Sequence, residues 1–370
     1  MTDSPEDILH PRRTMSLNGH EEAERLFLDA FNEDRLHHAW LVTGPKGVGK
    51  SSFAWRAAKF LMVHGQQKVG GDSLFGDALP PVVLSTLSVD ADHDTVTRIL
   101  AGTHSDINEI MRSPNKDTGK MRKEIVIDDI RALINQSTQT SSEGGWRIAI
   151  IDSVDELNVS AANALLKLLE EPPVKTILFL VSHSPGKLLP TIRSRCRALK
   201  LQPLPIESVK AVLAGKYPSL SVEEMNALSV LSEGAPGQAC SYAASNALSL
   251  YQDIMNILGQ FPRIDVPALH KFAEKLASVK ADADYHLFVD LLYFIRQRLL
   301  RYMATGEEVT PVSSNEIAIF HDISSKSTLD QQLDLWEKTI ELIGRASRVN
   351  LDRKQVILNI FSQMAALVSR

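Results

Sequence analysis

The stretch Gly44-Pro-Lys-Gly-Val-Gly-Lys-Ser-Ser52 decides the fold of this 370-residue chain. It fits the pattern G-x-x-x-x-G-K-[ST] of a phosphate-binding loop, in which glycines let backbone N–H groups converge on phosphate oxygens. The apolar run Ala39–Val42 precedes the loop, and the helical pattern Phe53–Leu61 follows it. Because a nucleotide-binding loop joins a strand to a helix, this context favours a true nucleotide site.

Two side chains of this loop have specific expected roles. Lys50 would reach the β- and γ-phosphates, and the Ser51 hydroxyl would hold Mg²⁺. We predict that the whole loop binds the nucleotide, through Gly44, Pro45, Lys46, Gly47, Val48, Gly49, Lys50, Ser51 and Ser52.

Composition indicates an ordinary globular protein of two or three domains, with 44% apolar and 23% charged residues. A net charge of only −5 gives no support for nucleic-acid binding from bulk charge. The two cysteines, Cys196 and Cys240, lack the paired spacing of a four-thiolate zinc module. The acidic start Met1–Asp7 does not resemble a signal peptide, and no apolar run approaches the ~20 residues of a membrane span. We therefore expect a cytoplasmic protein with no membrane partner.

The pattern of the chain changes near residue 203. Before this point, apolar runs such as Ala39–Val42, Trp146–Ile151 and Thr176–Val181 alternate with helical stretches. Strands separated by helices predict an α/β domain with a parallel sheet. After it, short helical patterns fill residues 204–247, and longer ones continue from 248 to 370. The predicted divisions are therefore 1–203, 204–247 and 248–370.

Two segments of the first part are predicted to be irregular. The Gly- and Asp-rich stretch from His64 to about Pro81 opens an insertion that extends to about residue 103. The basic loop Arg112–Lys123 is rich in turn-forming residues, which favours a solvated surface loop over a DNA contact.

Asp152 ends the buried strand pattern that begins at Arg147, which is typical of a Walker B carboxylate. The carboxyl end of a strand is where an α/β sheet presents ligand-binding groups, so Asp152 is predicted to reach the Mg²⁺ near Ser51. Nucleotide-hydrolysing proteins usually follow this Asp with a Glu, but the next residue here is Ser153. Losing a positioned general base costs about 10²–10⁴-fold in rate. We expect nucleotide binding with weak or absent hydrolysis.

Two further candidates lie beyond the strand Thr176–Val181. The Ser182 hydroxyl, at the end of this strand, is positioned to sense a γ-phosphate. Arg195 lies far along the chain from the phosphate loop, so it is predicted to serve the nucleotide of a neighbouring molecule.

The order and spacing of three motifs resemble the AAA+ clamp-loader family. These are the phosphate loop, the stretch Asn163-Ala-Leu-Leu-Lys-Leu-Leu-Glu-Glu-Pro-Pro173 and the triplet Ser194-Arg-Cys196. The resemblance implies an AAA+ P-loop domain, a small helical lid and an all-α collar that assembles subunits. It also implies that Arg195 acts in trans as an arginine finger, and that Leu17–His20 borders the base pocket.

The family implies partners and cofactors as well. The cofactors would be ATP or ADP with Mg²⁺, the latter held through Ser51 and Asp152. The partners would be gamma/tau motor subunits and a delta subunit in a hetero-oligomeric ring, with the sliding clamp and primed DNA contacted through the assembly. The zinc-binding cysteines of many relatives are missing, so no zinc is expected.

Departures from the motor pattern favour a stator of a DNA polymerase holoenzyme. Ser153 stands in place of the catalytic Glu, and Gly237 stands in place of the sensor Arg of the Gly-Ser-x-Arg motif. Two alternatives stay open. One is a gamma/tau-type ATPase that uses Asp155 or Glu156 as a substitute acid, and the other is a P-loop kinase of a small molecule.

Overall fold

The computed structural model describes residues 10–65, 83–115, 119–138, 145–278, 281–307, 310–349 and 351–369. It divides into two compact units, residues 1–204 and 205–370, which are described separately. Most of the insertion predicted from His64 to about Pro81 lies outside the described residues, as do residues 116–118 of the basic loop.

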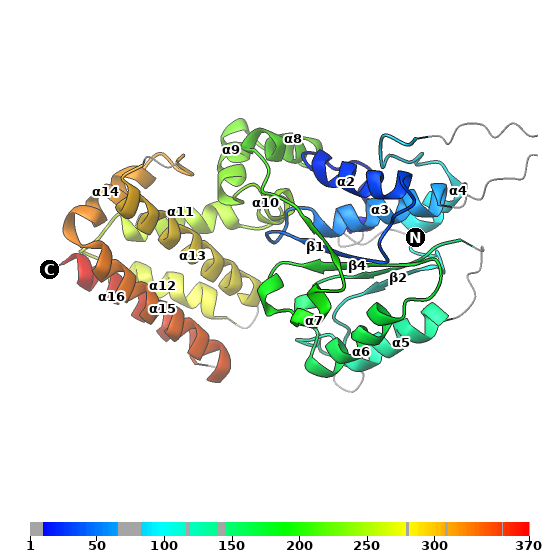
Figure 1. The fold of residues 1–370 in the computed structure, drawn as a ribbon. Helices are drawn as coiled ribbons and strands as arrows, with labels where there is room; N and C mark the ends of the chain where they lie inside the picture. Colours follow the sequence, from blue (N-terminus) through cyan, green and yellow to red (C-terminus); the bar gives the residue numbers. More distant parts are fainter. Residues whose placement is uncertain are drawn as a thin grey trace, which may run out of the picture. The chain divides into compact units, whose positions relative to one another are not determined.

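The first unit is an α/β domain (Figure 1). Its strands are β1 (Ala39–Thr43), β2 (Ile107–Ile110), β3 (Arg147–Ile151), β4 (Thr176–Ser182) and β5 (Arg197–Lys200). Its α-helices are α2 (Glu21–Asn32), α3 (Lys50–His64), α4 (Asp94–Leu100), α5 (Ile127–Thr138), α6 (Val159–Glu170) and α7 (Pro190–Arg193). The described residues of this unit also form three short 3₁₀ turns: η1 (Pro11–Arg13), η2 (Val154–Glu156) and η3 (Pro185–Lys187).

All five strands are parallel, in the order β2-β3-β4-β1-β5. Helices cover both faces: α2, α3 and α4 lie on one side and α5, α6 and α7 on the other (Figure 1). Both faces need covering because the apolar side chains of β1 alternate between two hydrophobic cores, one on each side of the sheet. Trp40 and Val42 pack with α2 and α3, whereas Ala39 and Leu41 pack with α5 and α6. Strands buried on both faces are apolar throughout, as the sequence indicated.

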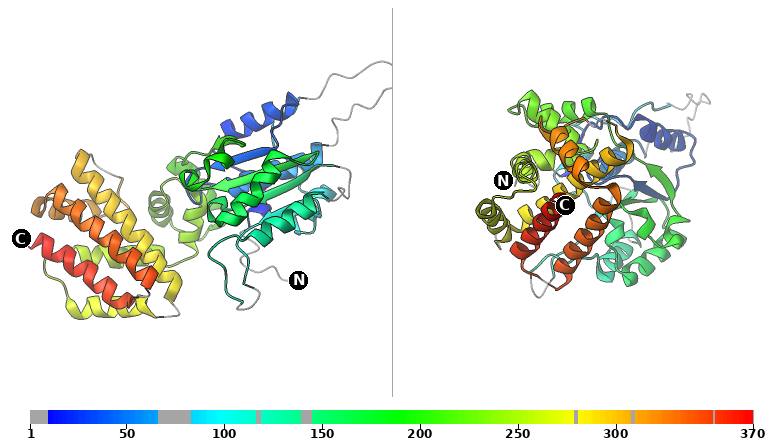
Figure 2. Two further views of the ribbon diagram at one scale, coloured as in Figure 1. Left: turned by 60° about the horizontal axis from the view of Figure 1, so that its bottom comes forward. Right: turned by 90° about the vertical axis from the view of Figure 1, so that its left-hand side faces the viewer.

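The second unit is helical (Figure 2). Its helices are α8 (Ile206–Lys216), α9 (Val222–Leu231), α10 (Pro236–Ala243), α11 (Ala247–Leu258), α12 (Val266–Ala277), α13 (Asp282–Thr305), α14 (Glu316–Lys326), α15 (Leu329–Val349) and α16 (Arg353–Val368). Helix α9 begins with a capping box, in which Ser221 and Glu224 each bond the other's backbone N–H. The predicted α/β domain with a parallel sheet followed by helices is confirmed. Division of the helical part at residue 247 stays a prediction.

Candidate nucleotide site and arginine turn

Three neighbouring strands bring the candidate nucleotide-binding residues to one edge of the sheet. The phosphate loop follows β1, Asp152 follows β3, and Ser182 is the last residue of β4. Strand β4 lies between the other two, with Ser182 paired to Thr43 and Leu180 paired to Ile151. Because parallel strands share the direction of their carboxyl ends, the sheet itself collects these groups at one place.

The glycines of the phosphate loop are required by its backbone. Gly44, Gly47 and Gly49 have φ angles of 146°, 77° and 111°. These angles lie in the region that side-chain-bearing residues rarely adopt. A Cβ at Gly44 would also lie 2.5 Å from the carbonyl oxygen of Leu201. The loop is therefore built for close approach of backbone to a ligand, with the Lys46 side chain exposed on its outer side.

The buried side chain of Lys50 bonds the backbone of its own loop. Its ammonium donates to the carbonyl oxygens of Gly44 (2.8 Å) and Pro45 (2.7 Å), and the residue is only 5% exposed. Burial lowers the pKa of Lys50 to about 8, although the carboxylates of Asp152 and Asp155 oppose the shift. A phosphate that binds here would replace two neutral carbonyls with charged oxygens, which pair with an ammonium more strongly.

The Ser51 hydroxyl donates to Asp152 Oδ2 over 2.9 Å. A hydroxyl and a carboxylate held this close are a donor set that fits Mg²⁺, which prefers oxygen ligands and retains waters and substrate phosphates. Ser51 and Asp152 therefore fit the predicted metal role. Across the described ranges, no group of three or more His, Cys, Asp or Glu residues is placed to hold a metal ion. The expected absence of zinc stays a prediction.

Asp155 and Glu156, the two acids that follow Ser153, both bond other residues of the domain. Asp155 accepts bonds from the Ser182 hydroxyl, the His183 N–H (2.8 Å) and the Ser184 N–H (3.1 Å), and its side chain is 4% exposed. Glu156 pairs with Arg112 over 2.9 Å. Asp155 thus fixes the loop after β4, including the hydroxyl that was predicted to sense a phosphate. The sequence analysis considered both as substitute acids, but no local signal revealed their partners.

Ser153 itself adopts an unusual backbone conformation, with φ 61° and ψ 55°. Left-handed geometry is uncommon for a residue with a side chain. It turns the chain directly from β3 into η2, which carries Asp155 to the end of β4.

The segment 10–20 lies against the phosphate loop and α3. The His20 ring bonds the Val48 carbonyl (Nε2 to O, 2.8 Å), and burial lowers the pKa of this histidine. Thr14 Oγ1 lies 3.4 Å from Ser52 Oγ, so the segment contacts both the middle and the C-terminal end of the loop. That Leu17–His20 also borders the base pocket stays a prediction.

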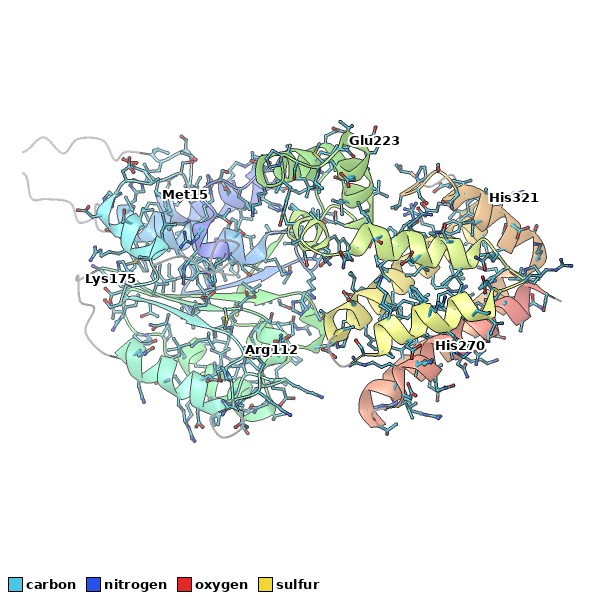
Figure 3. The ribbon with its side chains drawn as sticks, turned by 180° about the vertical axis from the view of Figure 1, so that it is seen from behind. Met15, Arg112, Lys175, Glu223, His270 and His321 are labelled. Atoms are coloured by element: carbon cyan, nitrogen blue, oxygen red, sulfur yellow. The ribbon has the colours of Figure 1, made fainter. Side chains whose placement is uncertain are left out.

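Lys59 holds the same segment against α3, a contact that the sequence did not predict. This α3 lysine is 1% exposed and donates to the carbonyl oxygens of Arg12 (2.8 Å) and Thr14 (2.7 Å). Burial lowers the pKa of Lys59 to about 8. In Figure 3 the neighbouring Met15 lies on the α3 side of the sheet, and Arg112 lies on the opposite side.

Arg195 lies in the turn between α7 and β5, away from the phosphate loop in sequence. Its guanidinium pairs with Glu170 Oε1 over 2.8 Å and donates to the Thr191 carbonyl oxygen over 3.0 Å. The side chain is 37% exposed, so it is not buried within its own domain. The sequence placed Arg195 at a surface but did not identify Glu170 as its partner.

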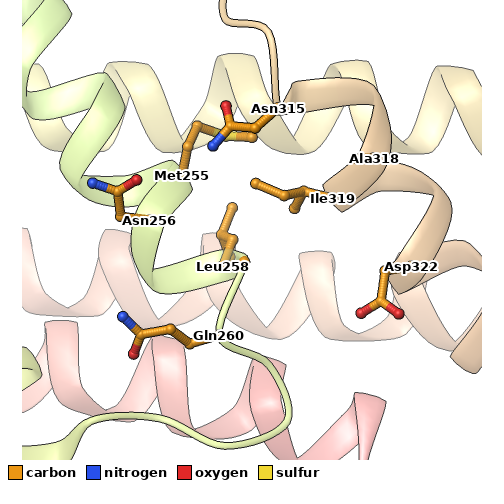
Figure 4. Close-up of a pocket in the computed structure, with 9 residues that line it drawn as sticks. Met255, Asn256, Leu258, Gln260, Asn315, Ala318, Ile319 and Asp322 are labelled. Carbon is orange, nitrogen blue, oxygen red and sulfur yellow. The ribbon is translucent and has the colours of Figure 1, made fainter.

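The helical unit contains a cavity of about 400 Å³ between α11 and α14 (Figure 4). Amide side chains of Asn256, Gln260 and Asn315 share its lining with apolar Leu258 and other residues. The carboxylate in this lining, Asp322, already pairs with Lys326 over 2.6 Å. We assign no chemistry to the cavity.

No helix within the described ranges is long and apolar enough to cross a membrane.

Comparison with known proteins agrees with the motifs. Residues 85–205 match the family described as DNA polymerase III, delta subunit. The chain is 34% identical over 200 residues to DNA polymerase III subunit delta' of Pseudomonas aeruginosa, covering 54% of this chain and 53% of that one. It is 29% identical over 211 residues to subunit delta' of Escherichia coli, covering 57% and 55%. The chain thus spans about half the length of these curated relatives.

Other relatives carry different subunit names. The chain is 26% identical over 373 residues to DNA polymerase III subunit tau of Bacillus subtilis, covering 90% of this chain and 58% of that one. Among solved structures, a gamma subunit-related protein of Thermotoga maritima is 18% identical with a TM-score of 0.39, covering 92% of this chain and 99% of that one.

Proposed function

We propose that this chain belongs to the AAA+ clamp-loader family of DNA polymerase III subunits and that it is a delta-prime-like stator within that assembly. In this role it binds ATP or ADP with Mg²⁺ at Lys50, Ser51 and Asp152. It hydrolyses the nucleotide poorly and supplies Arg195 to the ATP of a neighbouring motor subunit. Its partners are gamma/tau and delta subunits in a ring that places the sliding clamp on primed DNA.

The main support for this proposal is that the Asp155 carboxylate already accepts hydrogen bonds within its own domain. A substitute general base would need a carboxylate free to polarise water beside the γ-phosphate. Asp155 instead accepts three bonds from residues 182–184, and Glu156 is paired with Arg112. With Ser153 in place of the usual Glu, both substitute acids are already in use. Nucleotide binding is supported separately, by the glycine backbone and by the Ser51–Asp152 bond.

The second candidate is an ATPase motor of the gamma/tau type. It is favoured by the intact phosphate loop and by the likeness to subunit tau over 90% of this chain. The similarity to DNA polymerase III subunits gives no support to the P-loop kinase alternative.

Nucleotide binding and turnover by the purified full chain separate the two candidates. We expect ADP and ATP to bind, with turnover far below the ~1 s⁻¹ at which typical enzymes begin. Lys50→Ala is expected to weaken binding about 100-fold, because it removes the ammonium that faces the phosphates. Lys46→Ala is the matched control, because it removes an exposed side chain and keeps the backbone N–H with which this residue is expected to contribute to the loop. Turnover near 1 s⁻¹ or faster that disappears in Lys50→Ala would establish the motor instead.

A further inference from the structure

The C-terminal end of α6 carries two acids in a place where helices disfavour them. Glu170 is the last residue of α6, and Glu171 follows it directly. The negative end of the helix dipole lies at this terminus, so carboxylates here are unfavourable and lysine or arginine is the usual choice. The helix gains nothing from Glu170 itself. A contact outside the helix must therefore account for its position.

That contact is the guanidinium of Arg195. Besides the 2.8 Å ion pair with Glu170, Arg195 donates to the Thr191 carbonyl oxygen, and its Nη1 lies 3.5 Å from Ser194 Oγ. Helix α7 lies beside α6 (Figure 1), so the pair joins two neighbouring elements of one domain. Both side chains face solvent in part, 37% for Arg195 and 49% for Glu170.

Because both side chains are partly exposed, another anion can readily replace Glu170 as the partner of Arg195. Solvent-exposed ion pairs contribute little to stability and are weakened by salt. A triphosphate on another subunit offers several charged oxygens at once, which bind a guanidinium in a bidentate manner. The Glu170 carboxylate can therefore hold Arg195 when no phosphate is near and release it when one is.

Resting on the proposed trans role of Arg195, we propose that Glu170 is a positioning residue that holds the guanidinium on its own domain until a neighbour's nucleotide competes for it. An arginine finger acts through its positive charge on the transferred phosphoryl group. A carboxylate at 2.8 Å neutralises that charge, so the paired state is catalytically silent. Glu170 thereby suppresses hydrolysis in rings whose neighbouring nucleotide has not reached the guanidinium, which is the state we propose for rings without DNA.

The pair can be tested in the isolated full chain without nucleotide. Modification of Arg195 by phenylglyoxal, followed by peptide mass spectrometry, reports how well its guanidinium is protected. Glu170→Gln is expected to speed this modification about threefold or more at low salt. Glu171→Gln, which changes the adjacent exposed acid, is the control and should match the wild type. Equal rates in all three proteins would overturn the proposal.

The consequence for catalysis is tested in the reconstituted ring. Glu170→Gln is expected to raise hydrolysis without DNA about twofold to fivefold and to leave the DNA-stimulated rate nearly unchanged. A fall in both rates would overturn the proposal, because it would mean that Glu170 presents the finger rather than restraining it. Adding Arg195→Ala should remove the effect of Glu170→Gln, since a merely structural role would survive that change.

The trans role of Arg195 and its restraint by Glu170 can be rejected separately. If Arg195→Ala alone leaves ring hydrolysis unchanged, the trans finger is wrong and the restraint on it has no function. If Arg195→Ala slows the ring but Glu170→Gln does not raise the DNA-free rate, only the role of Glu170 is rejected.

Discussion

The phosphate loop and the arginine turn differ in how they hold their cations. Lys50 is 5% exposed and bonds two carbonyls of its own loop, whereas the Arg195 side chain is 37% exposed and pairs with one surface carboxylate. Burial fixes the first cation for a ligand that enters the domain. Exposure leaves the second available to a ligand outside it. Under the proposed function, one domain combines a bound nucleotide with an arginine that serves another subunit.

The largest effect expected from this contrast is in the assembled ring. Arg195→Ala should slow DNA-stimulated hydrolysis at the neighbouring subunit's site by about 10³-fold, because arginine fingers contribute 10³–10⁵ in rate. The chain's own affinity for nucleotide should not change. Hydrolysis assays on the reconstituted ring and calorimetry on the isolated chain measure the two quantities. Arg193→Ala, an exposed neighbour on α7, is the control. A loss of the chain's own affinity would instead place Arg195 in the cis site.

The second prediction concerns Asp155, which links η2 to the end of β4. Asp155→Asn should destabilise the protein by about 2 kcal/mol, because hydrogen bonds to a charged acceptor are worth roughly 1.5–3 kcal/mol. Urea unfolding measures this loss. Glu156→Gln, which breaks a more exposed pair, should cost less than about 1 kcal/mol. Turnover of ATP should stay equally low in both variants. A large drop in turnover with Asp155→Asn would identify it as the base of a motor.

The third prediction follows from the burial of Lys50, whose pKa is about 8 in the ligand-free protein. Bound phosphates favour the charged ammonium, so binding must take up a proton above pH 8. Affinity should then fall by up to about tenfold per pH unit between pH 8 and 9, since one pKa unit corresponds to 1.36 kcal/mol. Calorimetry in buffers of different ionisation enthalpy measures the uptake. Release of protons at pH 9 would contradict the assignment.

The smallest expected effect tests the second buried lysine of α3. The pKa of Lys59 is about 8 when folded, against an ordinary value of 10.5. Between these values the unfolded chain binds more protons, so this residue makes stability rise with pH, by about 1 kcal/mol per pH unit. Lys59→Met should remove that rise. The check is the difference in unfolding free energy between wild type and variant at pH 8 and pH 9. A difference independent of pH would show that Lys59 titrates normally.

Much of the site could be predicted because it depends on local patterns. The strands Ala39–Val42 and Thr176–Val181 were expected nearly as the structure has them, and the glycine spacing located the loop between β1 and α3. The edge strands β2 and β5 were not expected. Each has only four residues, and β5 (Arg197–Lys200) carries charges at both ends. Edge strands are often short and charged, so their sequences give little strand signal.

The contacts that could not be predicted join residues far apart in sequence. Asp155 meets Ser182 at a separation of 27 residues, and Glu170 at the end of α6 meets Arg195 in the turn after α7. Nothing within either segment specifies the partner, because the parallel sheet and the packing of α6 beside α7 create both neighbours. Lys59 was hidden for the same reason. Its charge suggested a surface position, whereas segment 10–20 covers it and supplies its acceptors.

The close contact between segment 10–20 and the phosphate loop also makes the protein easy to equip with an optical reporter. Burial raises the pKa of the Cys196 thiol to about 12 and also raises that of Cys240, so both native thiols resist maleimide near pH 7. A cysteine introduced at exposed Asn18, two residues before His20, would accept a dye selectively. Such a dye would lie beside the loop without replacing any group that faces the phosphates, and would follow nucleotide arrival in real time.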